Sequence, residues 1–265
     1  MIPLLLLVLC LFPFQTTQQP SAGVAMEKLQ EQAAAGAPES QFELARAYES
    51  GTGAPQNDEL AAKWYRAAAD QDYPQAENRL GVIYSRGHGV NPDKAEALRW
   101  YRKAAKHLLP EACFNVAISY YNGDGTPENF DLAYAWMLIA RDAGDTQAED
   151  ALKRMADELH GQVYSGKYKL AALYEKGDEV PANVPRAIDL YREIAEANVP
   201  GNMFAGEAQY KLCRLYATGS GVPLDYNQAR SWCKKATPWC GLCLYCSGTD
   251  GGTGTGRGER HSRSG

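Results

Sequence analysis

The segment from Tyr84 to Lys106 contains two patterns that can carry chemistry. Gly87 and Gly89 form a Gly-x-Gly turn that precedes a predicted helix. Glycine-rich turns before helices can bind phosphate through backbone N–H groups. The cluster Arg-Trp-Tyr-Arg-Lys at 99–103 mixes cations with aromatic rings, as some nucleic-acid binders do. Which chemistry applies depends on the elements that carry these residues.

The same patterns recur along the chain, which indicates an internal repeat. Three copies follow one another at an offset of 36 residues, and two more copies lie 42 residues apart downstream. In every copy a Tyr is followed by a glycine-containing turn, and a Trp or Leu comes 16 residues after the Tyr. These pairs are Tyr48 and Trp64, Tyr84 and Trp100, Tyr120 and Trp136, Tyr174 and Leu190, and Tyr216 and Trp232.

The recurrence predicts that each Gly-x-Gly segment is a turn between two amphipathic helices. Glycine adopts the positive φ that ends the first helix. Near the start of the second helix, Asn57, Asp93, Asn129 and Asp225 can accept hydrogen bonds from exposed N–H groups. A phosphate loop would follow a strand and would not be repeated, and no strand pattern precedes any copy. We therefore interpret the glycines as structural.

The aromatic positions predict buried helix faces. Trp64 and Ala68 lie four residues apart and share one stripe of the second helix. The first-helix tyrosines follow a Leu or Val by four residues, which predicts a core position with a hydroxyl at a polar edge. Arg99, Arg102 and Lys103 then lie on a solvated face. With a formal net charge of -5, the chain has no general attraction for nucleic acid, and we expect neither a nucleic-acid partner nor a cofactor.

These residues resemble the Sel-1-like repeat family, a subclass of the tetratricopeptide-type helical hairpins. The second copy, AENRLGVIYSRGHGVNPDKAEALRWYRKAA, matches the family pattern A-x-x-L-G-x-x-Y-x-x-G-x-G-V-x-x-D-x-x-K-A-x-x-W-Y-x-K-A-A at nearly every position. The resemblance extends from about Glu39 to Ala236. It implies an all-α fold, a right-handed α-solenoid of antiparallel helix pairs. It also implies non-enzymatic binding of a protein or peptide along the concave face.

The first 25 residues predict a secretory signal peptide. The apolar run Ile2–Phe14 is shorter than the roughly 20 residues that a membrane-spanning helix needs, and small residues precede possible cleavage sites after Ala22 and Ala25. We therefore expect export to the bacterial periplasm or the extracellular space, and no membrane span in the mature chain.

The remainder divides into four predicted segments. These are a capping helix over 26–38, three 36-residue repeats and a connecting helix over 39–160, two further repeats over 161–237, and a disordered Cys- and Gly-rich tail over 238–265. The connecting helix is expected at about Thr146 to Leu159, with a bend or split of the array near His160. Because Asp178 and Glu179 stand where the second glycine belongs, the turn of the fourth copy should differ from the others.

Two groups of cysteines stand out. Cys213 and Cys233 replace repeat residues on facing helices of the fifth hairpin, so they form either a disulfide in an oxidising compartment or two buried thiols. The tail residues Cys240, Cys243 and Cys246 have a spacing seen in zinc sites, but no second C-x2-C motif accompanies them, and we predict no metal site.

An alternative function comes from a cysteine-rich branch of the family, whose members include proteins described as β-lactam-binding or hydrolytic. In this chain only Cys113 occupies a matching first-helix position, and Ala140 stands where its partner cysteine would be. That alternative would require an enclosed pocket with a nucleophile and a base within hydrogen-bond reach.

The candidate partner-binding surface follows from the tetratricopeptide register, in which Leu44 and its equivalents point inward. Positions two before, two after and five after that leucine then line the concave groove. They are Phe42, Arg46, Glu49, Asn78, Val82, Ser85, Phe114, Ile118, Tyr121, Tyr168, Glu175, Tyr210 and Arg214. The aromatic members either anchor a peptide or pack between neighbouring repeats.

Overall fold

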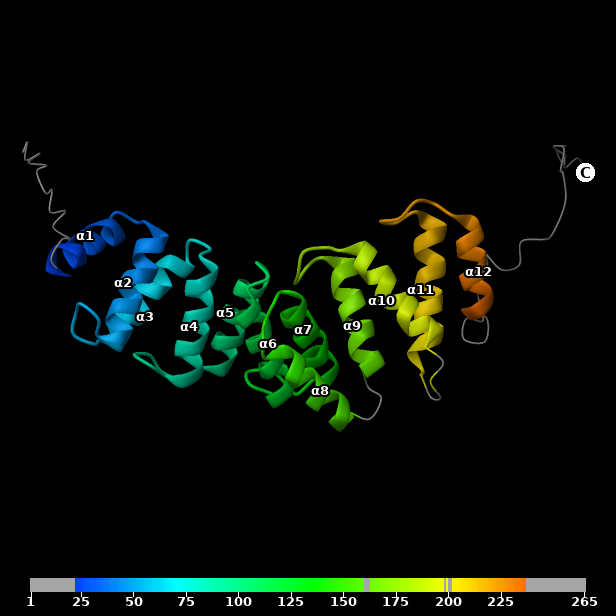
Figure 1. The fold of residues 1–265 in the computed structure, drawn as a ribbon, viewed down its shortest axis with the longest axis horizontal. Coiled ribbons are helices and arrows are strands. Elements are labelled where there is room, and N and C mark those ends of the chain that lie inside the picture. Colours follow the sequence, from blue (N-terminus) through cyan, green and yellow to red (C-terminus); the bar gives the residue numbers. More distant parts are fainter. Residues whose placement is uncertain (1–21, 160–162, 198, 200–201, 237–265) are drawn as a thin grey trace, which may run out of the picture.

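The computed structural model describes residues 22–159, 163–197, 199 and 202–236, and these residues form twelve helices and no strand. Most of the predicted signal peptide (1–25) and the predicted tail (238–265) lie outside the described residues, as do His160 and the three tail cysteines. Figure 1 shows the helices arranged side by side in chain order from one end of the molecule to the other. The prediction of an all-α repeat fold is confirmed.

The helix bounds follow the repeat. They are α1 (Ala22–Ala34), α2 (Pro38–Ser50), α3 (Asp58–Ala69), α4 (Pro74–Arg86), α5 (Lys94–Ala105), α6 (Pro110–Asn122), α7 (Phe130–Asp142), α8 (Ala148–Leu159), α9 (Val163–Lys176), α10 (Val184–Glu196), α11 (Phe204–Thr218) and α12 (Tyr226–Ala236).

Five helical hairpins make up the array: α2 with α3, α4 with α5, α6 with α7, α9 with α10, and α11 with α12. The second helix of each hairpin packs on the first helix of the next, and α1 packs on α2. Each hairpin therefore buries its apolar faces against its neighbours, which is how helical repeats build a continuous core.

The hairpin turn begins and ends in the same way in every copy. A glycine with a φ of 68–79° ends the first helix, at Gly51, Gly87, Gly123, Gly177 and Gly219. The residue nine positions after the repeat tyrosine then donates its backbone N–H to that tyrosine's carbonyl oxygen, as Asn57 does to Tyr48 at 2.9 Å. Its side chain caps the second helix, and the predicted caps are confirmed. The fourth copy has the same cap at Asn183, which the sequence analysis missed although its position is equivalent.

The second glycine of the turn allows close contact between repeats. A Cβ atom added to Gly125 would lie 2.3 Å from the carbonyl oxygen of Lys94 in the preceding hairpin. Glu179 occupies this position in the fourth copy, and there its carboxylate pairs with Arg102 of α5 at 2.9 Å. The fourth turn thus replaces a close backbone contact with an ion pair between the second and fourth copies.

Helix α8 is inserted between the third and fourth hairpins without interrupting the stack. Both α8 and α9 pack on α7, so α9 takes the place that the first helix of the next repeat would have. Gly166 of α9 makes this possible, because a Cβ there would lie 2.7 Å from the ring of Tyr134. One core cluster extends from Ala97 to Cys233, so the hydrophobic core continues across this junction.

None of the described helices has both the length and the apolar character needed to span a membrane.

Candidate functional site

Two hydrogen-bonded pairs of tyrosine and glutamate mark equivalent positions in the first and fourth hairpins. The hydroxyl of Tyr65 donates to Glu49 at 2.6 Å, and that of Tyr191 donates to Glu175 at 2.8 Å. Burial and the bond to the carboxylate raise the pKa of Tyr65 and of Tyr191 in the same way. Both phenols therefore remain protonated donors that fix the predicted groove residues Glu49 and Glu175.

Cations from the neighbouring first helix complete each pair. Lys211 donates to Glu175 at 2.9 Å, Arg214 lies 3.5 Å from the same carboxylate, and Arg79 lies 3.9 Å from Glu49. Burial alone would raise the pKa of Glu175, but the hydrogen bonds from Lys211 and Tyr191 and the nearby positive charges outweigh it and lower the pKa. The surface formed by the first helices of the hairpins, which we call the first-helix face, therefore carries oriented carboxylates beside cations.

A further row of side chains reaches the same face from the position just before the inward leucine. Arg79 and Lys211 belong to this row, and so does Asn115, whose amide donates to the predicted groove residue Asn78 at 3.0 Å. The sequence analysis missed the row. Helical spacing could have found it, because it lies three residues before the predicted positions Val82, Ile118 and Arg214.

The predicted aromatic anchors are mostly packed. Phe42 lies 5.6 Å from Tyr65 and 5.3 Å from Tyr73 between ring centroids, and Tyr168 lies 5.6 Å from Phe204. Phe114, like Val82, packs partly buried against the core. Among the four, Tyr210 is exposed, at 40% of its surface. Burial and Glu207 raise the pKa of Tyr168 to about 12.

The first hollow on this face lies between α1, α2 and α4, with a volume of about 590 Å³. Met26 and Leu29 of α1 give it an apolar wall, and Arg46, Glu49 and Arg79 give it a charged one. Arg46 is half-exposed and pairs with Glu43 at 3.1 Å. This hollow brings the predicted residues Arg46 and Glu49 together with a helix that the repeat register did not include.

The second hollow lies between α6, α7 and α8, with a volume of about 200 Å³. Ile118, Tyr121 and Met137 face Met155 of α8 across it, and Arg154 adds a cation. Met137 replaces the tyrosine that pairs with glutamate in the first and fourth hairpins, so the surface is more apolar here. Since α8 forms one wall, the inserted helix lies on the groove side of the third hairpin.

The side chains that line these two hollows include no histidine and no cysteine. Within the part of the chain that the structure describes, no three His, Cys, Asp or Glu residues come together in a way that could hold a metal ion.

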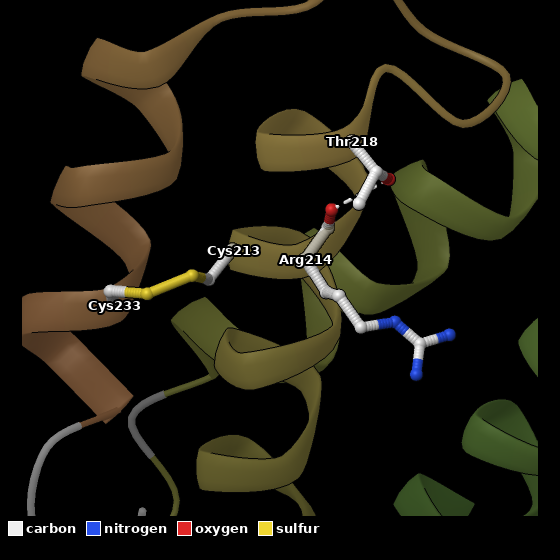
Figure 2. The surroundings of a disulfide bond; sticks show 4 residues. All are labelled: Cys213, Arg214, Thr218 and Cys233. Carbon is white, nitrogen blue, oxygen red and sulfur yellow. Dashed lines mark hydrogen bonds between the residues drawn. A yellow bond between two sulfur atoms is a disulfide. The ribbon is translucent and has the colours of Figure 1, made fainter. Parts of the chain in front are cut away.

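The cysteines of the fifth hairpin form a disulfide in the structure, with Cys213 of α11 and Cys233 of α12 at a Cα–Cα distance of 5.2 Å. Figure 2 shows Cys213 pointing to α12 while the side chain of Arg214 points away from it. The disulfide therefore closes the hairpin without using the surface that carries Arg214. Cys113 is a buried free thiol, and burial raises its pKa to about 12.

Comparison with known proteins gives a consistent result. The Sel1 repeat family model matches five segments that together cover more than half of the chain: residues 38–73, 74–107, 110–145, 165–199 and 206–237. A Sel1 repeat protein from Oxalobacter formigenes is 30% identical over 82% of this chain and 79% of that chain, with a TM-score of 0.46. None of the curated proteins matches the chain.

A second solved structure is a protective antigen present in uropathogenic Escherichia coli strains, which displays an SLR fold. It is 25% identical over 82% of this chain, with a TM-score of 0.51, and the match covers 57% of the antigen.

Proposed function

The chain belongs to the Sel1 repeat family, and from this premise we propose that it is an exported, non-enzymatic scaffold that binds a protein or peptide on its first-helix face. Sel1 repeat proteins generally mediate protein–protein interactions. Helical repeat arrays present extended concave surfaces that suit this role.

The observation that carries the proposal is the pair of hollows on this face. One combines Met26 and Leu29 with Arg46 and Glu49, and the other combines Met137 and Met155 with Arg154. An apolar wall beside a few oriented charges is a common composition of binding sites, because burial supplies affinity and the charges fix the orientation. A bound segment of mixed apolar and charged residues would suit both hollows.

Site-specific crosslinking tests this assignment. A photoreactive residue placed at Arg46, Tyr121 or Tyr210 should capture one and the same partner, since all three positions lie on the proposed face. Lys63, an exposed residue of the second helix α3, is the control position. A partner captured equally well from Lys63, or from that position alone, would contradict binding on the first-helix face.

Export is a separate part of the proposal. The leader-like first 25 residues and the disulfide between Cys213 and Cys233 support it, because disulfides persist in oxidising compartments. N-terminal sequencing of the protein from the cells that produce it should find a chain that begins at Gly23 or Met26. A chain that retains Met1 and contains a free Cys213 thiol would contradict export.

A further inference from the structure

A third hollow lies between α3 and α5, the second helices of the first two hairpins. It has a volume of about 390 Å³. Its lining consists of Arg66 and Asp70 from α3 and its C-cap, and of Arg99, Trp100, Arg102, Lys103 and Lys106 from the middle of α5 to its C-cap. We call these seven residues the basic surface. Five of them are cations and one is an acid, although the whole chain has a net charge of -5.

Two of the cations, Arg66 and Lys103, lie over the indole ring of Trp100, which is 4% exposed. The guanidinium carbon of Arg66 lies 4.6 Å from the ring centroid, and the ammonium of Lys103 lies 4.5 Å from it. Glu96 fixes the indole, because Trp100 Nε1 donates to its carboxylate at 2.8 Å. Stacking on an aromatic ring orders cationic side chains that would otherwise be mobile.

Part of the charge on the basic surface is not neutralised within the chain. Arg99 pairs with Glu96 at 2.6 Å, Arg66 lies 3.9 Å from the same carboxylate, and Arg102 pairs with Glu179 at 2.9 Å. Among the described residues, no carboxylate lies within ion-pair distance of Lys103 or Lys106, and Arg99 keeps 74% of its side chain exposed. An ordered array of N–H donors therefore faces solvent with an excess of positive charge.

We propose that the basic surface binds an acidic peptide segment of a partner protein. The forked donors of arginine match the geometry of carboxylates, and the ammonium groups add attraction without directional constraint. The patch is confined to two neighbouring helices, α3 and α5, in an otherwise acidic chain, so it suits a short cluster of Asp or Glu side chains. An extended polyanion would meet repulsion from the rest of the surface. This site is independent of the first-helix face.

Fluorescence anisotropy with a short labelled Glu-rich peptide, and with its Gln counterpart, tests the proposal. The variant Lys103→Gln/Lys106→Gln should weaken binding of the Glu-rich peptide on the order of tenfold, since two exposed ion pairs are lost. The matched control Lys63→Gln/Lys153→Gln removes the same net charge elsewhere and should bind as the parent does. Affinity of the parent should fall as salt is added, and the Gln peptide should not bind.

Several outcomes would overturn the proposal. Equal weakening in both double variants would show a general charge effect, and equal binding of the Glu and Gln peptides would show that carboxylates are not recognised. Tighter binding of a single-stranded oligonucleotide through Lys103 and Lys106 would assign the surface to nucleic acid. If Arg214→Gln abolished binding of the Glu-rich peptide and Lys103→Gln/Lys106→Gln did not weaken it, the acidic peptide would bind on the first-helix face instead. Crosslinking from Arg46 tests that face separately.

Discussion

One position of the repeat, three residues before the inward-facing leucine or valine of the first helix, has different side chains in different copies but the same structural environment. Gln41 donates its amide N–H to the carbonyl of Ala33 at 3.1 Å, and Gln209 donates to that of Ala195 at 3.2 Å, each near the end of the preceding helix. The second copy has Glu77 at this position. Its side chain is buried, and its Oε2 atom has no hydrogen-bond partner among the described residues. An ionised carboxylate cannot donate as the glutamines do.

Replacing Glu77 with Gln should therefore stabilise the protein by about 1–2 kcal/mol at pH 7, because a donor replaces a buried acceptor without a partner. Burial raises the pKa of Glu77; the positive charges of His107 and Lys103 oppose this effect, and Asp72 adds to it. The folded state thus holds the proton more tightly than the unfolded state, whose carboxyl has the ordinary value of 4.5. Parent stability falls as pH rises from the unfolded pKa through the raised folded pKa.

Urea unfolding of the parent and Glu77→Gln over a pH series measures this difference. The advantage of the variant should be small below the unfolded pKa and complete above the folded one. A difference that stays constant with pH would mean that the carboxyl titrates alike in both states. A destabilised variant would mean that an ionised Glu77 makes a favourable contact.

At the scale of the element, the second turn glycine limits how closely hairpins can stack. Gly219, a first turn glycine, is the comparison. Changing it to Ala places a side chain at a φ of 68°, with its nearest neighbour atoms at 3.5 Å, and should cost about 1 kcal/mol of backbone strain. Changing Gly125 to Ala, at a φ of 74°, adds a contact of 2.3 Å with the Lys94 carbonyl oxygen. We expect it to cost at least about 2 kcal/mol more, because backbone must move.

Thermal unfolding of the two alanine variants separates the strain from the clash, since both glycines have nearly the same φ. Equal losses in stability would show that the hairpins can separate without cost at Gly125.

The repeat elements were predictable because their signals are local. The turn glycines and the caps act within a few residues, so one period of 36 residues located them in the first three copies, and the same rule applied to the fourth would have found Asn183. The packing of α9 on α7 was not predictable, because it depends on close contact between Gly166 and Tyr134, which are separated in the sequence by the inserted helix α8.

The candidate site was only partly predictable for a related reason. The register found Glu49 and Glu175, but their partners Tyr65 and Tyr191 lie on the facing helix, 16 residues away. Tyrosine at that position had no signal of its own, since its ring is also a suitable core residue. The wall that Met155 contributes depends on where α8 lies.

At the scale of the whole molecule, the disulfide should act locally. It closes a loop with a sequence separation of 20 residues, for which chain entropy predicts about 3 kcal/mol of stabilisation. Because each hairpin packs mainly on its neighbours, Cys213→Ala/Cys233→Ala should raise hydrogen exchange in α11 and α12 and leave α2 to α5 unchanged.

Dithiothreitol provides the control for this experiment. It should reproduce the exchange pattern in the parent and have no effect on the double variant, whose remaining described cysteine, Cys113, is a free thiol. A uniform increase along the chain would show that the array unfolds as one cooperative unit.

Helix α8 shows how the array accommodates added sequence. The chain leaves α7, forms a further helix against it, and returns to place α9 on the same helix, so the later hairpins keep their stacking. The junction between α7 and α9 is therefore a natural insertion point. A segment inserted there would leave the spacing of the other hairpins unchanged. It would lie beside the groove and would change which ligands the groove binds. Among related repeat proteins, binding specificity could then diverge through replacement of this one inserted segment, while the hairpins around it stay the same.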